Sequence, residues 1–219
     1  MLHIDKFWLL VILILTSFFV LSTYFYPKLP EQIPTHWNIK GEVDGYMKKE
    51  FGLLVMPALS VLIVILLAYL PKMDPLKKNY SFFMPYFKGF IVVFSFFSLY
   101  IHMLIIAAGL GYAVEINHFL LPAFGLLFIY ISLLLKKSKR NWFVGIRTPW
   151  TLSSDKVWEK TNKAGSIVFL IHGLLFLFVV TVVNLLPTII LALILSIIIS
   201  SIILCIYSYL LYVSEKKNK

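Results

Sequence analysis

Six apolar runs of roughly 20 residues each dominate this chain of 219 residues. They extend over Phe7–Tyr26, Phe51–Leu70, Phe87–Leu110, Phe119–Leu135, Ser166–Leu186 and Thr188–Val213. A helix needs about 20 such residues to cross ~30 Å of hydrocarbon. Membrane-spanning strands would instead be segments of about 10 residues with alternating hydrophobicity. The runs therefore predict an all-α polytopic membrane protein with six transmembrane helices, located in the cell membrane.

Composition supports a lipid environment, because 60% of the residues are hydrophobic and only 14% are charged. Soluble chains contain about 45–50% apolar and about 25% charged residues. The first apolar run is too long for the core of a signal peptide, and no small-residue cleavage site follows it. We therefore expect it to remain as the first span. The single cysteine, Cys205, lies in an apolar run and forms no intrachain disulfide.

The distribution of basic residues predicts the orientation. The loop between the first two spans, Pro27–Glu50, is neutral, with four lysines and four acids. The other 16 of the 20 basic residues lie on one side if both termini are cytoplasmic. Lysine and arginine concentrate in cytoplasmic loops, so we predict both termini inside and Pro27–Glu50 outside. The same rule explains the net charge of +10 without a nucleic-acid partner and leaves anionic membrane lipid as the expected contact.

The outer loop is predicted to be ordered, because its prolines restrict the backbone and Gly41 and Asp44-Gly45 are turn signals. A small hairpin with Gly41–Gly45 at its tip is expected. Its recognition candidates are His36, Trp37, Asn38, Gly41, Asp44 and Gly45. Trp37 offers rigid contact area and His36 a pH-responsive group. The alternative is that Trp37 anchors at the headgroup level and His36 closes a hydrogen bond within the loop.

The loop between the fourth and fifth spans, residues 136–163, carries eight basic residues against Asp155 and Glu159. Ser153-Ser154-Asp155 is typical of a helix start, and we expect a helix over Ser154–Lys163 that lies along the membrane surface and leads into the fifth span near Gly165. This loop is interpreted either as a docking surface for a cytoplasmic protein or as a brace between its two spans. The docking candidates are Gly145, Arg147, Thr148, Pro149, Trp150 and Trp158.

The sequence contains no GxSxG, HExxH, Walker A or Cys/His metal spacing, so we predict no catalytic residue, metal or cofactor. No Asp, Glu, Lys or Arg falls in the middle of a span, whereas proton-coupled transporters bury such groups. His102 and His172 are the polar candidates within spans. They are interpreted as hydrogen-bonded interhelical residues, with a two-histidine relay as the alternative. A very tight turn at Asn184–Pro187 should join the last two spans.

Two stretches resemble one family. LPEQIPTHWNIKGEVDGY, followed by a helix entered through Phe51-Gly52, resembles the outer-loop motif of SdpI-type membrane proteins. NWFVGIRTPWTLSSDKVWEKTNKAG resembles their cytoplasmic motif. The resemblance covers nearly the whole chain. It suggests an N-terminal module over 1–70, with two spans and the ordered outer loop 27–50, and a four-span SdpI-like module over 71–219, with the cytoplasmic loop 136–163.

The resemblance implies an immunity protein rather than an enzyme. Such a protein protects the producing cell from a secreted peptide toxin that attacks the cytoplasmic membrane. It also acts as a receptor, holding a small winged-helix repressor at the membrane when toxin is present. The outer loop would then face the toxin and the 136–163 loop the repressor. The alternatives are a transporter or small-molecule sensor that uses His102 and His172, and a membrane enzyme with His36 as base.

Overall fold

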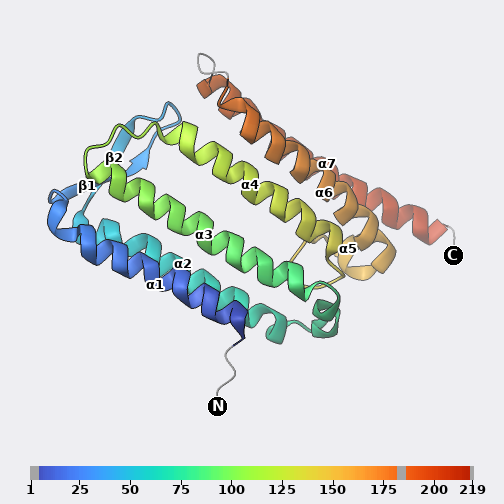
Figure 1. The fold of residues 1–219 in the computed structure, drawn as a ribbon. Helices are drawn as coiled ribbons and strands as arrows, with labels where there is room; N and C mark the ends of the chain where they lie inside the picture. The colour runs from blue at the N-terminus through green and yellow to red at the C-terminus, as the bar shows by residue number, and fades with distance from the viewer. Residues whose placement is uncertain (1–4, 182–185, 218–219) are drawn as a thin grey trace. The chain divides into compact units, whose positions relative to one another are not determined.

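The computed structural model describes residues 5–181 and 186–217. Six of its helices are long and apolar enough to cross a membrane, which confirms the predicted all-α, multi-pass architecture (Figure 1). These helices are α1 (Lys6–Phe25), α2 (Lys49–Met73), α3 (Met84–Gly109), α4 (Ile116–Lys137), α6 (Asp155–Val179) and α7 (Leu186–Lys217). The shorter elements are η1 (Tyr26–Lys28), β1 (Gln32–Trp37), β2 (Val43–Lys48), η2 (Lys77–Phe82) and α5 (Pro149–Ser153).

The fifth long helix differs most from its expected bounds. It begins at Asp155, where the side chain of Ser154 accepts a hydrogen bond from the backbone N–H of Val157. The helix start at Ser154 is therefore as predicted. The segment that was expected to lie along the membrane surface, however, is continuous with the span as the beginning of α6. Burial of Trp158 and Asn162 against other parts of the chain holds it in line with the span. The turn expected at Asn184 falls on residues 182–185, outside the described part of the chain.

The chain forms two compact units. The first unit comprises Met1–Leu67 and Ile91–Ala123, and the second comprises Ala68–Phe90 and Phe124–Lys219. Helices α2, α3 and α4 each contribute residues to both.

A buried aliphatic cluster forms part of the first unit's core. Leu29 and Ile33 enter it from the segment after α1, Leu53 from α2, and Ile105 and Ile106 from α3. The side chain of Ile33, in β1, is fully buried. Strands β1 and β2 pair antiparallel next to this cluster, at the end of the unit where α1 finishes and α2 begins (Figure 1).

The core of the second unit contains packed aromatic rings. The ring centroid of Phe128, on α4, lies 5.2 Å from that of Phe169 and 5.4 Å from that of Phe176, both on α6. The two helices approach closely, because a Cβ on Gly125 would lie 2.8 Å from the carbonyl oxygen of Gly173. Glycine at this position therefore permits near backbone contact between α4 and α6, the kind of approach that small residues allow in membrane helices.

Candidate functional site

The β1–β2 hairpin is anchored by its buried face. Ile33 is completely buried and belongs to the aliphatic cluster, and Trp37 packs against the edge of the same cluster. The N–H of Lys49 donates to the carbonyl of Glu31 at 2.9 Å, and the ammonium of Lys49 reaches the carbonyl of Leu29 at 3.2 Å. The hairpin is thus an ordered platform and not a free loop, as the sequence predicted.

Asn38 organises the turn of the hairpin. Its side-chain oxygen accepts hydrogen bonds from the N–H groups of Lys40 and Glu42, at 2.9 and 3.1 Å, and its amide donates to the carboxylate of Glu42 at 2.9 Å. Gly41 adopts a φ of 86°, which other residues adopt only with strain. The tip is therefore 38–42. Gly45, which we expected at the tip, lies in β2 opposite His36.

The outward face of the hairpin carries a polar pair and an exposed aromatic ring. His36 Nδ1 lies 2.5 Å from Asp44 Oδ1, and 73% of the His36 side chain is exposed. Tyr46, on the same strand as Asp44, is 59% exposed. Trp37 and Asn38, by contrast, have internal packing and turn-forming roles. The candidates that remain accessible to a partner are His36 and Asp44, and the sequence reasoning missed Tyr46 next to them.

In the parts of the chain that are described, no group of three His, Cys, Asp or Glu residues is arranged to hold a metal ion. The His36–Asp44 pair offers one nitrogen and one carboxylate, fewer than the four ligands of a typical structural zinc site.

Tight internal packing characterises the 136–163 loop. Trp158 is 1% exposed, and its Nε1–H donates to the carbonyl of Ser138 at 3.3 Å. The side-chain oxygen of Asn162 accepts the N–H of Ile146 at 2.8 Å. Gly145 has a φ of 130°, and a Cβ there would lie 2.8 Å from both Asn162 and Trp158. These three residues lock the loop onto the start of α6.

The segment before α3 contributes a second set of bonds to this loop, which sequence reasoning missed. One carboxylate oxygen of Asp74 accepts the N–H of Leu76 at 2.7 Å, and the other accepts the N–H of Trp142 at 2.8 Å. Asp74 is 2% exposed. Burial, reinforced by the nearby charge of Asp74, raises the pKa of the Tyr80 phenol. In the sequence, the only sign of this role is that Asp74 is an acid in a loop whose other charged residues are lysines.

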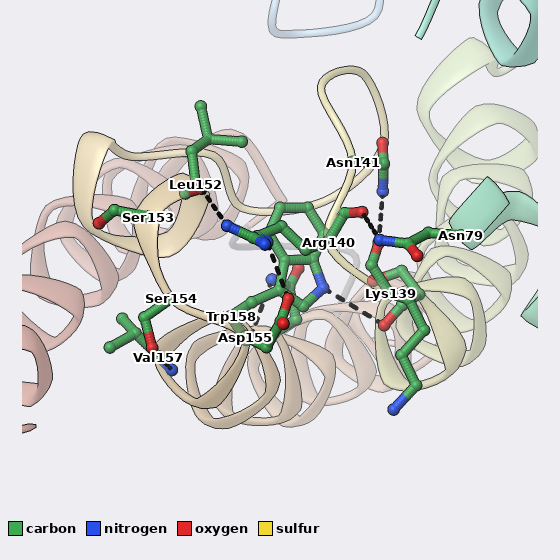
Figure 2. Close-up of polar contacts among 12 residues, drawn as sticks. Asn79, Lys139, Arg140, Asn141, Leu152, Ser153, Ser154, Asp155, Val157 and Trp158 are labelled. Carbon is green, nitrogen blue, oxygen red and sulfur yellow. Dashed lines mark hydrogen bonds and ion pairs between the residues drawn. The ribbon is translucent and has the colours of Figure 1, made fainter. Parts of the chain in front are cut away.

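Asn141 closes the bend of the loop. Its amide donates to the carbonyls of Lys139 and Val144, at 2.8 and 2.7 Å, and its oxygen accepts the N–H of Val144 at 2.6 Å. Figure 2 shows the bond to Lys139 and, beside it, the amide of Asn79 donating to the carbonyl of Arg140 at 2.6 Å. Asn141 is fully buried, so these bonds replace the water that its amide would otherwise bind.

Further contacts fix the loop at α5 and α7. Figure 2 shows the guanidinium of Arg140 between the carbonyl of Leu152, at 2.9 Å, and the carboxylate of Asp155, at 2.7 Å. The hydroxyl of Thr148 lies 2.9 Å from that of Ser208 on α7. The hydroxyl of Ser154 donates to the Glu215 carboxylate at 2.5 Å. This region therefore braces α4, α6 and α7 together, which is one of the two interpretations offered by the sequence.

The docking candidates in this loop differ in accessibility. Thr148 and Trp158 are buried, whereas Arg147 and Pro149 are exposed. The guanidinium of Arg147 donates to the carbonyl of Trp142 at 2.7 Å, and Trp142 is itself 51% exposed. The ring centroid of Trp150 lies 5.1 Å from that of Tyr209. Among the docking candidates, Arg147 and Pro149 therefore remain accessible, and Trp142 is exposed beside them.

The two histidines within spans lie in different units and bind different partners. His102, on α3, is fully buried, with Nε2 3.0 Å from the hydroxyl of Ser22 on α1. His172 Nδ1 lies 2.8 Å from the carbonyl of Val168, and Nε2 lies 2.9 Å from the hydroxyl of Ser196 on α7. A carbonyl only accepts, so Nδ1 of His172 donates to the carbonyl of Val168. Each histidine joins two helices.

Comparisons with known proteins cover both motif regions. A model of the SdpI/YfhL protein family matches residues 137–208, and a model of a domain of unknown function, DUF1648, matches residues 11–61. Immunity protein SdpI of Bacillus subtilis (strain 168) is 26% identical over 162 residues, which are 74% of this chain and 75% of the relative. No solved structure matches significantly.

Proposed function

We propose that this chain is an SdpI-type immunity protein that protects its cell from a secreted, membrane-active peptide toxin. The observation that carries the proposal is the similarity to the immunity protein over about three quarters of both chains. The toxin and the manner of protection are inferred from that similarity and from the geometry of the hairpin.

The outward face of the hairpin is the recognition surface in this proposal. His36, Asp44 and Tyr46 are exposed on a platform that Ile33 holds rigidly. A rigid surface loses little conformational entropy on binding, and an exposed aromatic ring gives contact area at low entropic cost. The histidine and the carboxylate add hydrogen-bonding groups that define the partner's polarity.

The proposal includes signalling to the cytoplasm. The orientation predicted from charge places the exposed residues Trp142, Arg147 and Pro149 on the inner side, where a winged-helix repressor would bind. Toxin binding must then favour one arrangement of the helices that also changes the affinity for the repressor. Helices α2, α3 and α4 each contribute residues to both compact units, so each offers a covalent route for such a change.

Protection is tested by expressing the protein in a toxin-sensitive host and measuring survival against secreted peptide toxins. The key variant combines His36→Ala, Asp44→Ala and Tyr46→Ala, which removes the outward face and spares Ile33, Trp37 and Asn38. The matched control combines Gln32→Ala and Lys48→Ala, which are exposed at the other end of the same hairpin. Membrane levels of all forms are compared by immunoblot.

We expect the wild type and the control to protect and the key variant to fail. Full protection by the key variant would show that this face of the hairpin is not the recognition surface. If the wild type protects against none of the secreted peptide toxins tested, the proposed immunity function is wrong.

Signalling is tested separately by fractionating cells that co-express a fluorescent winged-helix repressor encoded near this protein. The repressor should move to the membrane when toxin is added, and Arg147→Ala should reduce that movement. Lys160→Ala, an exposed lysine on α6, is the charge-matched control. An unchanged distribution with Arg147→Ala would exclude this residue from the docking surface.

A further inference from the structure

A groove of about 510 Å³ lies in the second unit, between the α4 and α6 helices. Its apolar walls include Leu126, Ile129 and Leu133 on α4, together with Ile167 and Leu170 on α6. None of the contacts described above for the hairpin or for the docking candidates uses these residues. The groove is open to the surroundings of the helices, which for spans of this kind means lipid.

The two helices run antiparallel along the groove, and its two ends are lined by different kinds of side chain. Gly125 meets Gly173 at one level, and Leu135 approaches Gly165 at another, nearer the loop that joins the helices. Continuing this register brings Lys136 and Lys163 to the same end, and both line the groove. Ser132 and Ser166 line it as well. One end is therefore cationic and hydroxyl-bearing, and the rest is aliphatic.

The lysines at this end lack an acidic partner. Both are exposed, and neither belongs to an ion pair in the described part of the chain, where Arg140, for comparison, is paired with Asp155. The neighbouring Lys137 lies instead over the ring of Tyr86, 5.5 Å from its centroid. Lys136 and Lys163 thus present two ammonium groups to whatever occupies the end of the groove.

The length of the groove matches one leaflet of a membrane. Lys136 and Leu126 are ten positions apart on α4, which corresponds to about 15 Å at a rise of about 1.5 Å per residue. The hydrocarbon core is about 30 Å thick, so one leaflet is about 15 Å deep. An acyl chain whose headgroup lies at the lysines would therefore follow the apolar walls to the bilayer midplane.

We propose that this groove binds one anionic glycerophospholipid, with its phosphate between Lys136 and Lys163 and an acyl chain along Leu126, Leu133 and Leu170. Basic pockets between transmembrane helices on the cytoplasmic side suit such headgroups. The general excess of basic residues in cytoplasmic loops explains why lysines lie at this level. It does not explain why two lysines without a counter-ion flank a groove that is as deep as one membrane leaflet. The bound lipid would fill the space between α4 and α6.

The proposal is tested by native mass spectrometry of the full-length protein, delipidated in detergent and titrated with phosphatidylglycerol or phosphatidylcholine of identical acyl chains. The wild type should bind one phosphatidylglycerol in clear preference to phosphatidylcholine. Lys136→Gln with Lys163→Gln should weaken phosphatidylglycerol binding roughly 30-fold, since each lysine near an anionic headgroup contributes a factor of about five. Phosphatidylcholine binding should change little.

Two further variants separate charge from shape. Lys77→Gln with Lys78→Gln removes the same charge at exposed positions outside the groove and should bind like the wild type. Leu133→Trp fills the apolar wall and should weaken both lipids without changing the charge. Thermal unfolding in detergent shows whether each variant is folded.

Several outcomes would overturn the proposal. Equal binding of the two lipids by the wild type would do so, as would an equal loss of binding by the Lys77/Lys78 control. Inorganic phosphate or glycerol phosphate that binds as tightly as the lipid would identify a site for free phosphate instead. A dimer that forms only when Leu133 is intact, and that excludes lipid, would identify a second copy of the chain as the occupant.

Discussion

The carboxylate of Asp74 accepts a hydrogen bond from the backbone N–H of Trp142, with 2.8 Å between the oxygen and the nitrogen. These residues flank different spans, and Asp74 is almost completely buried. A buried carboxylate is costly unless its oxygens are paired. Here the second oxygen accepts the N–H of Leu76. Asp74 therefore ties the loop before α3 to the loop after α4 and gives the second unit a fixed polar end.

Asp74→Ala should destabilise the second unit, because it leaves the N–H groups of Leu76 and Trp142 without acceptors. An unsatisfied buried donor costs about 1–3 kcal/mol. We expect faster trypsin cleavage in the 136–154 region and a lower midpoint of thermal unfolding in detergent. Glu159→Gln, at an exposed acid on α6, is the control and should leave both unchanged. Equal behaviour of the two variants would contradict the role of Asp74.

Gly145→Ala should cost more stability than Gly111→Ala, although both glycines have positive φ. A Cβ at Gly111 meets nothing within 4 Å, so its cost is backbone strain of about 1–2 kcal/mol. A Cβ at Gly145 would lie 2.8 Å from Asn162 and Trp158. Overpacking of this kind adds about 1–3 kcal/mol. The comparison is made by unfolding both variants in the same detergent, and equal shifts would argue against the tight contact.

Ile33→Ala should loosen the β1–β2 hairpin, whereas Ile39→Ala should not. Ile33 is fully buried in the aliphatic cluster, and Ile39 is 44% exposed at the turn. Truncating a buried isoleucine to alanine costs about 2–5 kcal/mol. Hydrogen exchange of the amides in β1 and β2 measures the effect, and protection should fall in the first variant. Unchanged protection would mean that the hairpin is held by its backbone bonds and not by this side chain.

His172→Leu tests whether this histidine joins helices or takes part in transport. The bond between His172 and Ser196 links α6 to α7, and such bonds within membranes contribute about 0.6 kcal/mol on average. We therefore expect a small drop in the unfolding midpoint, matched by Ser196→Ala, and unimpaired toxin protection. Loss of protection by a variant that remains folded would favour the transporter interpretation.

Much of the fold follows from local properties of the sequence. Apolar length predicted six spans, and the Ser154 hydroxyl followed by Asp155 predicted the start of α6, because a cap is satisfied by residues within one turn. Turn chemistry predicted the hairpin, although its tip is at 38–42 and not at Gly41–Gly45. The orientation of the termini stays a prediction from charge. The motif resemblance predicted an SdpI-type protein, and a model of the SdpI/YfhL family matches residues 137–208.

The sequence by itself determined which segments enter the membrane, because lipid requires long apolar helices whatever their neighbours are. It did not determine which polar residues are accessible. Trp158 and Arg147 lie in one motif, yet one is buried and the other exposed. That difference arises from contacts with residues far away along the chain, such as the bond between Trp158 and Ser138. The pairing of Lys136 with Lys163 across the groove likewise depends on the antiparallel register of α4 and α6. Only tertiary packing sets such a register, because it brings together residues that no local pattern relates.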